Sequence, residues 1–180
     1  KYGFDPVYIK STTPITLSAS DESGVRETRY KVGISGDCLD YSGAFAVSVA
    51  GTNEILYYSV DNAGNVETAR MLSVYVDDVA PETSIVVGSP SYISGLNAWV
   101  RGFTEITLSV DDSPGSGTTP GSPGSGTLGS SYSVDEGALM QYAGAFTLLT
   151  EGRHTVDCKS VDNLGNEEAL KRGSFIVDET

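Results

Sequence analysis

The feature that most constrains the fold of this chain is an internal repeat. Residues 55–67 and 156–168 are identical at 7 of 13 positions without a gap, and both contain the motif Ser-Val-Asp-Asn-x-Gly-Asn. Shorter matches precede it in the same order, at 15–18 with 106–109 and at 41–45 with 142–146. A repeat of this length predicts two similar structural units in tandem.

The repeat is interrupted by one insertion. The spacing between matched residues is 91 in the first part of the copies and 101 in the second. The extra residues lie mainly in 113–129, which is almost entirely Gly, Ser, Pro and Thr. Such a segment buries too little apolar surface to offset the entropy lost on ordering. Because matched motifs stand on both sides of it, we expect a long flexible loop inside the second copy.

The boundary between the copies is predicted at Asp77–Pro81. It follows the last strand-like run of the first copy, and Pro81 removes a backbone N–H that strand pairing would need. We therefore divide the chain into a first repeat at residues 1–78 and a second repeat at residues 79–180.

The first copy lacks one strand of the second. Tyr8-Ile9 aligns with Trp99-Val100, which leaves the β-rich run at 83–87 without a counterpart. The sequence leaves two explanations open: the chain is an N-terminally truncated piece of a longer protein, or residues 1–9 take the place of that strand.

Short runs of alternating apolar and polar residues, separated by turn signals, predict β-strands in both copies, and no segment has a sustained helical period. In the first copy we expect strands near 15–20, 26–33, 44–49, 54–60 and 68–76. In the second copy we expect them near 83–87, 98–101, 104–110, 130–135, 145–149, 153–161 and 168–177. The sequence therefore predicts an all-β protein of two tandem immunoglobulin-like β-sandwich domains. The short linker and Pro81 favour an extended arrangement.

Charge and composition exclude several classes of function. The net charge of −13 repels phosphate backbones and anionic membrane surfaces, so we expect no nucleic-acid partner, whereas metal cations fit. No run is long and apolar enough for a membrane helix, so we expect no membrane insertion. One His and two Cys, Cys38 and Cys158, offer little for catalysis, and we expect a protein that is not an enzyme.

The acidic clusters are the candidate binding site. The loops after the second strand and before the last strand of a sandwich lie at the same end, which the linker also reaches. The sequence therefore predicts structural Ca²⁺, which takes six to eight oxygen ligands, at the domain junction. The candidate ligands are Asp77, Asp78, Asp111, Asp112, Asp162 and Asn163. The first copy offers Asp5, Asp21 and Asp61. The alternative is that these side chains only close Asx-turns.

The remaining candidates are single residues. Cys38 and Cys158 stand at non-equivalent positions in separate repeats, so we expect two free thiols. His154 is expected to be a surface side chain. Trp99 and the strand tyrosines Tyr57-Tyr58 and Tyr75 could form an outward aromatic surface for a sugar, although a core position is the alternative.

The second copy resembles a known class of repeat. The resemblance is carried by Ala80–Thr83, Trp99-Val100, Ile106–Asp112, Ser125-Gly126, Tyr132–Asp135, Tyr142–Phe146, Glu151–Val156 and Ser160–Asn166. In this order they look like the bacterial Ig-like repeats of secreted and surface proteins, among them the OmpL47-type repeat. They are also similar to the chitobiase C-terminal-like domains attached to glycoside hydrolases. The resemblance implies an extracellular stalk, adhesin or enzyme accessory module without catalysis. The insertion at 113–129 departs from the usual pattern.

We therefore predict a stalk or adhesin segment of a larger, repetitive bacterial cell-surface protein. Its expected partners are neighbouring repeats of the same protein, with self-association through a strand edge and a glycan as further candidates. The alternative is an ancillary, carbohydrate-binding module of a secreted glycoside hydrolase.

Overall fold

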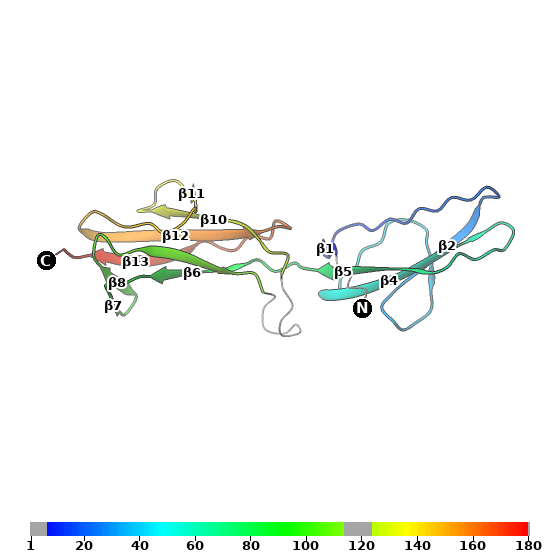
Figure 1. Cartoon of the computed structure of the whole chain (residues 1–180), viewed down its shortest axis with the longest axis horizontal. Helices are drawn as coiled ribbons and strands as arrows, with labels where there is room; N and C mark the ends of the chain where they lie inside the picture. The colour runs from blue at the N-terminus through cyan, green and yellow to red at the C-terminus, as the bar shows by residue number, and fades with distance from the viewer. Residues whose placement is uncertain (1–6, 114–123, 180) are drawn as a thin grey trace. The chain divides into compact units, whose positions relative to one another are not determined.

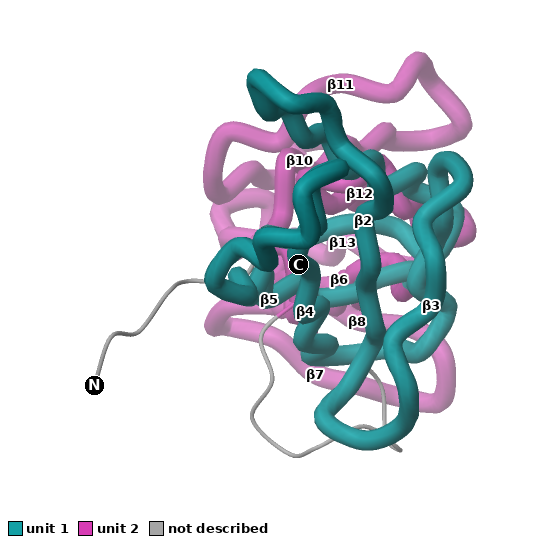
Figure 2. Tube along the Cα trace, turned by 90° about the vertical axis from the view of Figure 1, so that its right-hand side faces the viewer, with its two compact units in different colours: residues 1–78, 116–122 teal, residues 79–115, 123–180 magenta. Residues whose placement is uncertain are grey.

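The computed structural model describes residues 7–113 and 124–179. The chain divides into two compact units, with the boundary after Asp78 (Figure 2). All regular elements in the described residues are β-strands, so the prediction of immunoglobulin-like β-sandwich units is confirmed (Figure 1). No helix in this part of the chain has the length and apolarity to cross a membrane. The extended arrangement of the units stays a prediction.

Unit 1 is built on one five-stranded sheet. Its strands are β1 (Val7–Ile9), β2 (Val25–Val32), β3 (Leu39–Asp40), β4 (Gly51–Asp61) and β5 (Arg70–Val76). The spatial order is β1-β5-β4-β2-β3, in which β1 pairs with β5 in parallel and the other pairs are antiparallel. The predicted strands near 26–33, 54–60 and 68–76 correspond to β2, β4 and β5.

Unit 2 repeats this sheet and adds strands to it. β6 (Glu82–Val87) and β9 (Ile106–Asp111) form a two-stranded sheet, and the order of the larger sheet is β11-β10-β12-β13-β8-β7. Its members are β7 (Ser91–Ser94), β8 (Asn97–Val100), β10 (Thr127–Val134), β11 (Met140–Gln141), β12 (Gly152–Asp162) and β13 (Lys171–Val177). As in unit 1, the last strand pairs in parallel with an earlier strand, here β8.

The register relates the two units residue by residue. Ile9 pairs with Val76 in unit 1, and Val100 pairs with Val177 in unit 2. β1 is therefore the counterpart of β8, not of β6. Of the predicted alternatives for residues 1–9, residues 7–9 do not take the place of the 83–87 strand, and residues 1–6 lie outside the described part.

Two predicted strands of the first copy and one of the second need correction. The segments 44–49 and 145–149 contribute only single bridges, from Phe45 to Ile15 and from Phe146 to Ile106. The segment 15–20 is likewise a bridge rather than a strand, although its counterpart 106–111 is strand β9. The difference has a simple cause: β9 pairs along its whole length with β6, and no described residue of unit 1 takes that role.

The predicted loop at 113–129 is also partly wrong. Residues 114–123 lie outside the described part, but Thr127–Gly129 begin strand β10 and pair with Val161 and Asp162 through a register shift. The composition of this segment hid the strand, because Gly and Thr at a bulge pair through backbone groups that the side-chain pattern does not reveal.

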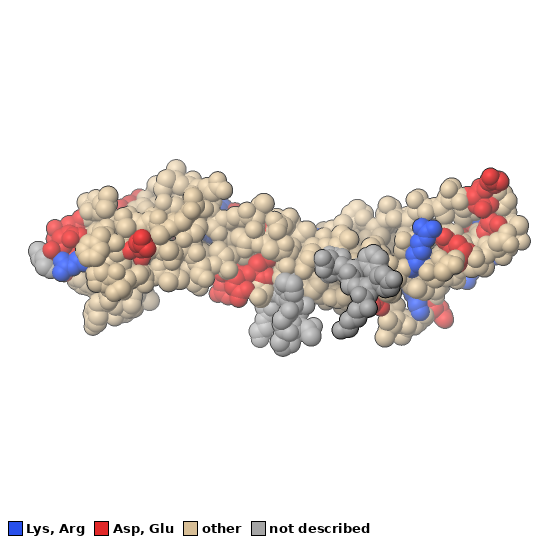
Figure 3. Space-filling view, in the orientation of Figure 1, with Lys and Arg blue, Asp and Glu red and all other residues tan. Residues whose placement is uncertain are grey.

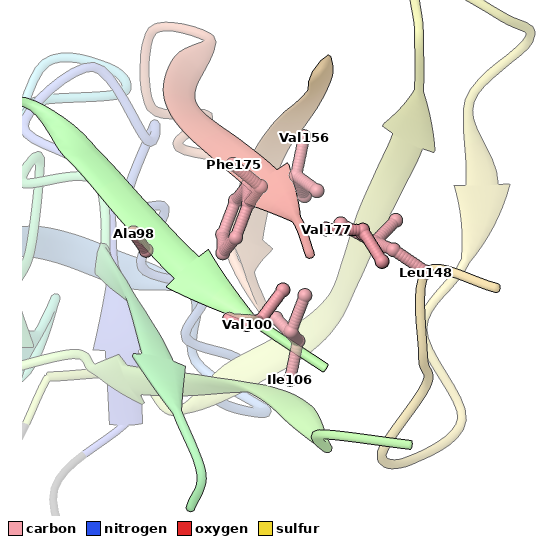
Figure 4. Close-up of a cluster of buried hydrophobic side chains, with 7 residues drawn as sticks. All are labelled: Ala98, Val100, Ile106, Leu148, Val156, Phe175 and Val177. Carbon is pink, nitrogen blue, oxygen red and sulfur yellow. The ribbon is translucent and has the colours of Figure 1, made fainter. Parts of the chain in front are cut away.

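Each unit has its own apolar core. In unit 2 the core side chains come from β8, β9, β12, β13 and the segment before β12 (Figure 4): Ala98, Val100, Ile106, Leu148, Val156, Phe175 and Val177. The core of unit 1 consists of Ile9, Val47, Ile55, Val74 and Val76. The shared Tyr-x-Gly-Ala-Phe motif places an aromatic ring beside each core. Phe45 stacks on Tyr30 at 3.9 Å between ring centroids, and Phe146 stacks on Tyr132 at 4.2 Å.

Candidate functional site

The acidic motif of each repeat lies in the turn that follows its longest strand. In unit 2 the carboxylate of Asp162, the last residue of β12, has no exposed surface. Its Oδ1 accepts hydrogen bonds from the amides of Leu164 at 2.9 Å and Asn166 at 2.7 Å, and its Oδ2 accepts one from Asn166 Nδ2 at 2.7 Å. This carboxylate closes its own turn. That is the Asx-turn given above as the alternative to a calcium ligand.

Unit 1 builds the same turn. Asp61 Oδ1 accepts from the Asn65 amide and Asp61 Oδ2 accepts from Asn65 Nδ2, both at 2.7 Å. These hydrogen bonds from Asn65 lower the pKa of Asp61. Asp21 accepts from the Ser23 amide and hydroxyl, and Asp5 lies outside the described residues.

The asparagine of the motif holds a second loop in place. Asn163 donates from its amide to Gly126 O at 2.8 Å and from Nδ2 to Ser125 O at 2.9 Å. Asn62 makes the matching bonds in unit 1, to the carbonyls of Gly24 and Ser23. The Asn therefore ties the loop before β10 or β2 to the turn before the last strand. The sequence did not predict this role, although a Ser-Gly pair precedes the Asn at a similar distance in both copies, Ser23-Gly24 and Ser125-Gly126.

Asp112 holds the two ends of the inserted segment together, and Asp111 closes a turn where the segment begins. Asp112 Oδ2 accepts from the Gly126 amide at 2.6 Å, and the Asp112 carbonyl accepts from the Gly124 amide at 2.7 Å. Asp111 Oδ1 accepts from the Ser113 amide at 2.9 Å, and hydrogen bonding from Ser113 lowers the pKa of Asp111. The two ends of the insertion are thus joined to each other by hydrogen bonds where they meet unit 2.

Of the predicted metal ligands in unit 2, Asp112 and Asp162 each place a carboxylate oxygen within 4.8 Å of the other. Asp77 and Asp78 end unit 1: the Asp77 amide donates to Ile9 O at 2.9 Å, and Asp78 Oδ1 accepts from the Ser11 amide at 3.0 Å. The side chains of Asp111, Asp112, Asp162 and Asn163 all make local hydrogen bonds. Ca²⁺ binding by this set stays a prediction.

His154 is not the surface side chain that the sequence predicts. Only 10% of its side chain is exposed, and both ring nitrogens are bonded: Nδ1 lies 2.7 Å from Asp135 Oδ2, and Nε2 lies 2.7 Å from Thr150 O. Both partners are acceptors, so only the doubly protonated ring satisfies both bonds. The hydrogen bond with Asp135 raises the pKa of His154. The residue fastens the start of β12 to the end of β10.

Both cysteines are free thiols, as expected. Cys158 is fully buried, and burial raises the pKa of its thiol. Cys38 is partly exposed just before β3.

One aromatic pair faces outward on unit 2. Tyr92 on β7 and Trp99 on β8 are cross-strand partners, with exposed fractions of 69% and 38%. They line a hollow of ≈ 240 Å³ together with Pro90, Ser91, Val100, Arg101 and Asp178. Aromatic faces beside a guanidinium and a carboxylate suit the flat apolar side and the hydroxyl rim of a sugar ring. Of the predicted tyrosines, Tyr75 is buried and cannot serve this surface.

The charged surface agrees with the sequence. On the face shown in Figure 3, acidic side chains form most of the charged groups. This distribution suits cations and neutral ligands better than polyanions.

Comparisons with known proteins add little. No family model matches the chain, and no curated protein matches it significantly. Among solved structures, fibronectin(III)-like modules of CbhA from Clostridium thermocellum align at a TM-score of 0.40 and 12% identity, over 96% of this chain and 90% of that one. The D00-D0 domain of intimin aligns at a TM-score of 0.40 and 12% identity, over 99% and 98%. Likenesses at this level carry no argument about function.

Proposed function

We propose that this chain is a non-catalytic structural module, a stalk or adhesin segment of a larger repetitive cell-surface protein. The duplicated architecture supports this. Each unit closes its own core and builds the same turn and loop clamp from the same motif. A tandem of self-sufficient units is what a repetitive stalk requires.

One observation carries the proposal: in both units the last strand is paired in parallel with an earlier strand. β5 pairs with β1, and β13 pairs with β8. When two parallel neighbours are pulled from opposite ends, their hydrogen bonds are loaded together in shear rather than one after another. In unit 1 these are the first and last described strands, so tension along that unit loads the parallel pair in shear. In unit 2 the pair β8–β13 resists tension in the same way once load reaches β8, which follows β6 and β7 in the chain.

Single-molecule force spectroscopy tests this by changing only the direction of pulling. Handles at Leu96→Cys and Glu179→Cys load β8 and β13 of the full chain in shear. Handles at Arg101→Cys and Glu179→Cys peel the same two strands apart from one end. Both variants carry Cys38→Ser, and the buried Cys158 stays in place.

We expect the shear pair to unfold at clearly higher force than the peeling pair. Equal forces for the two geometries would contradict a load-bearing role for the parallel pair. Equilibrium unfolding of both variants in urea serves as the control, because a difference in force has meaning only if their stabilities match.

A second candidate function is carbohydrate binding by an ancillary module of a secreted glycoside hydrolase. The exposed Tyr92–Trp99 pair beside Arg101 favours it. Pull-down on insoluble chitin and cellulose tests it, with Trp99→Ala as the variant and Phe103→Ala, an aromatic that is 67% exposed outside this hollow, as the matched control. Retention lost only in Trp99→Ala supports this function, and equal retention of both variants contradicts it.

A further inference from the structure

Unit 1 contains a groove with a volume of ≈ 400 Å³. One wall is the segment 17–21, and the other wall comes from β2, β4, β5 and the turn between β4 and β5. The second wall includes Ser59, Glu67 and Arg70. Among the described residues, the 15–20 segment has a single bridge, at Ile15, so the backbone of 16–20 forms an open edge along the groove.

In unit 2 the matching place is filled by strand β6. β6 pairs with β9 in continuous register from Glu82 opposite Asp111 to Val87 opposite Ile106. β9 is the counterpart of the segment 15–20, since residues 106–109 repeat residues 15–18. The wall segment 17–21 of unit 1 thus corresponds to the residues that face the first half of β6.

The central contact of β6 is Thr83, which is 2% exposed. Its hydroxyl lies 2.6 Å from Ser160 Oγ and also bonds the carboxylate of Glu168. Its amide donates to Glu168 Oε2 at 3.1 Å, and its carbonyl accepts from Lys171 Nζ at 2.8 Å. Three side chains therefore bind the hydroxyl, N–H and C=O of one threonine: Ser160 of β12, Lys171 of β13, and Glu168 of the segment between these strands.

Unit 1 has equivalents of all three side chains: Ser59 for Ser160, Glu67 for Glu168, and Arg70 for Lys171. Glu67 and Glu168 are equivalent, because their amides donate to the carbonyls of Ser59 and Ser160. Arg70 follows Glu67 by three residues and pairs with it at 3.5 Å, as Lys171 pairs with Glu168 at 3.1 Å.

Exposure separates the two sites. The side chain of Glu168 is 6% exposed under β6, whereas the side chain of Glu67 is 34% exposed. Ser160 is buried and Ser59 is only partly buried. The polar groups that receive β6 in unit 2 are thus present in unit 1 and reachable from solvent.

We propose that this groove of unit 1 is an acceptor site for an extended β-strand with the pattern of β6. The occupant pairs its backbone with 16–20. It places a threonine on Ser59 and Glu67, and Arg70 donates to the carbonyl of that threonine. Apolar side chains follow at every second position after the threonine, as Ile85 and Val87 do in β6, whose burial alternates in this way.

The probe is a fluorescently labelled peptide with the sequence of residues 80–88, titrated into the full chain and followed by anisotropy. We expect saturable binding and slowed amide exchange of residues 16–20 in the complex. A peptide in which the threonine is replaced by valine keeps the shape but loses the hydroxyl. Since a hydrogen bond to a charged partner contributes about 1.5–3 kcal/mol, its affinity should fall about tenfold or more.

Variants of the chain locate the binding. Glu67→Ala should lower the affinity by a similar factor, whereas Arg70→Lys, which restores the unit 2 residue, should keep it. Lys31→Ala removes a positive charge outside the groove lining and should have no effect.

The proposal is overturned if binding does not saturate, if Glu67→Ala binds as well as the parent, or if the slowed exchange maps to β9 instead of 16–20. The last result would mean that the peptide displaces β6 from unit 2. The exchange map of the free Glu67→Ala chain is recorded in parallel, so that loss of binding in a chain that keeps its protected core is assigned to the groove.

Discussion

The carboxylate of Glu168 should account for a large share of the stability of unit 2. It accepts hydrogen bonds from the Thr83 amide and hydroxyl and from the Ser160 amide, and it pairs with Lys171. Glu168→Ala removes all of these at once. Because Thr83 and Ser160 are each 2% exposed, their freed N–H groups are left in a place that water does not reach in the parent.

The magnitude follows from these donors. A buried donor left without a partner costs about 1–3 kcal/mol. The amides of Thr83 and Ser160 lose their partner, whereas the Thr83 hydroxyl keeps Ser160 Oγ. Partial relaxation and entry of water reduce the sum, so we expect a loss of about 3 kcal/mol from the free energy of unfolding of unit 2. With a urea dependence of about 1.5 kcal/mol per molar for a domain of this size, the midpoint should fall by about 2 M.

The chain carries its own reporter and its own control. Trp99 is the single tryptophan and lies in unit 2, so its fluorescence follows the unfolding of that unit in the full chain. The control is Glu67→Ala, the equivalent change in unit 1. Glu67 is 34% exposed and pairs only weakly, so its loss should cost less than about 1 kcal/mol and leave the Trp99 transition unchanged.

The pH dependence gives a second readout of the same carboxylate. Burial acts to raise the pKa of Glu168, but the hydrogen bonds from Thr83 and the pairing with Lys171 outweigh it, so the pKa is lowered on balance. The stabilisation is therefore present above the pKa of an unfolded Glu and lost as the pH falls through the folded value. If Glu168→Ala moves the midpoint by less than about 0.5 M, the reasoning about buried donors is wrong.

Three further outcomes are expected. Because the pKa of His154 is raised in the folded chain, its contribution to stability is complete below its unfolded pKa and is lost as the pH rises through its folded pKa. The urea midpoint followed by Trp99 should therefore be lower at pH 8.5 than at pH 5.5. His154→Gln should remove this difference between the two pH values. Gly124→Ala should lower that midpoint, because a Cβ there would lie 1.9 Å from Asp112 O, whereas Gly129→Ala meets nothing within 4 Å and should be neutral. If Ca²⁺ binds, 2 mM CaCl₂ should raise the melting temperature relative to EDTA and Asp112→Asn should abolish the rise; identical curves would contradict the calcium prediction.

The repeat was sufficient to predict the fold class, because period-two alternation in long strands such as β4 and β12 is a strong local signal. The same alternation predicted strands at 15–20 and 44–49, where the structure has only single bridges. Whether such a segment becomes a strand depends on a partner strand, and the pattern of a segment does not contain its partner. The pairing of β9 with β6, and the lack of an equivalent among the described residues of unit 1, is a tertiary effect of this kind.

The candidate site shows the same limit. Acidic residues in turns are recognisable in sequence, but their hydrogen-bond partners are not. Asp162 closes its own turn and Asn163 clamps a loop about 40 residues earlier in the chain, and both roles depend on register. The prediction that His154 is a surface side chain is wrong for the same reason, since its partner Asp135 lies across a strand pair and not beside it in sequence.

The residues shared by the two repeats fall into two groups with different explanations. The Asp, Asn and Gly of the turn motif are accounted for inside each unit by hydrogen bonds of the turn and its clamp, so their recurrence does not require a metal ion. The first Ser of the motif and the Glu that follows it are Ser160 and Glu168 in unit 2, where both bind Thr83 of β6. Their equivalents in unit 1 are Ser59 and Glu67. In unit 1 the same pair lines an open groove. The recurrence of the motif as a whole therefore favours binding of a β-strand in the groove of unit 1 over binding of a cation.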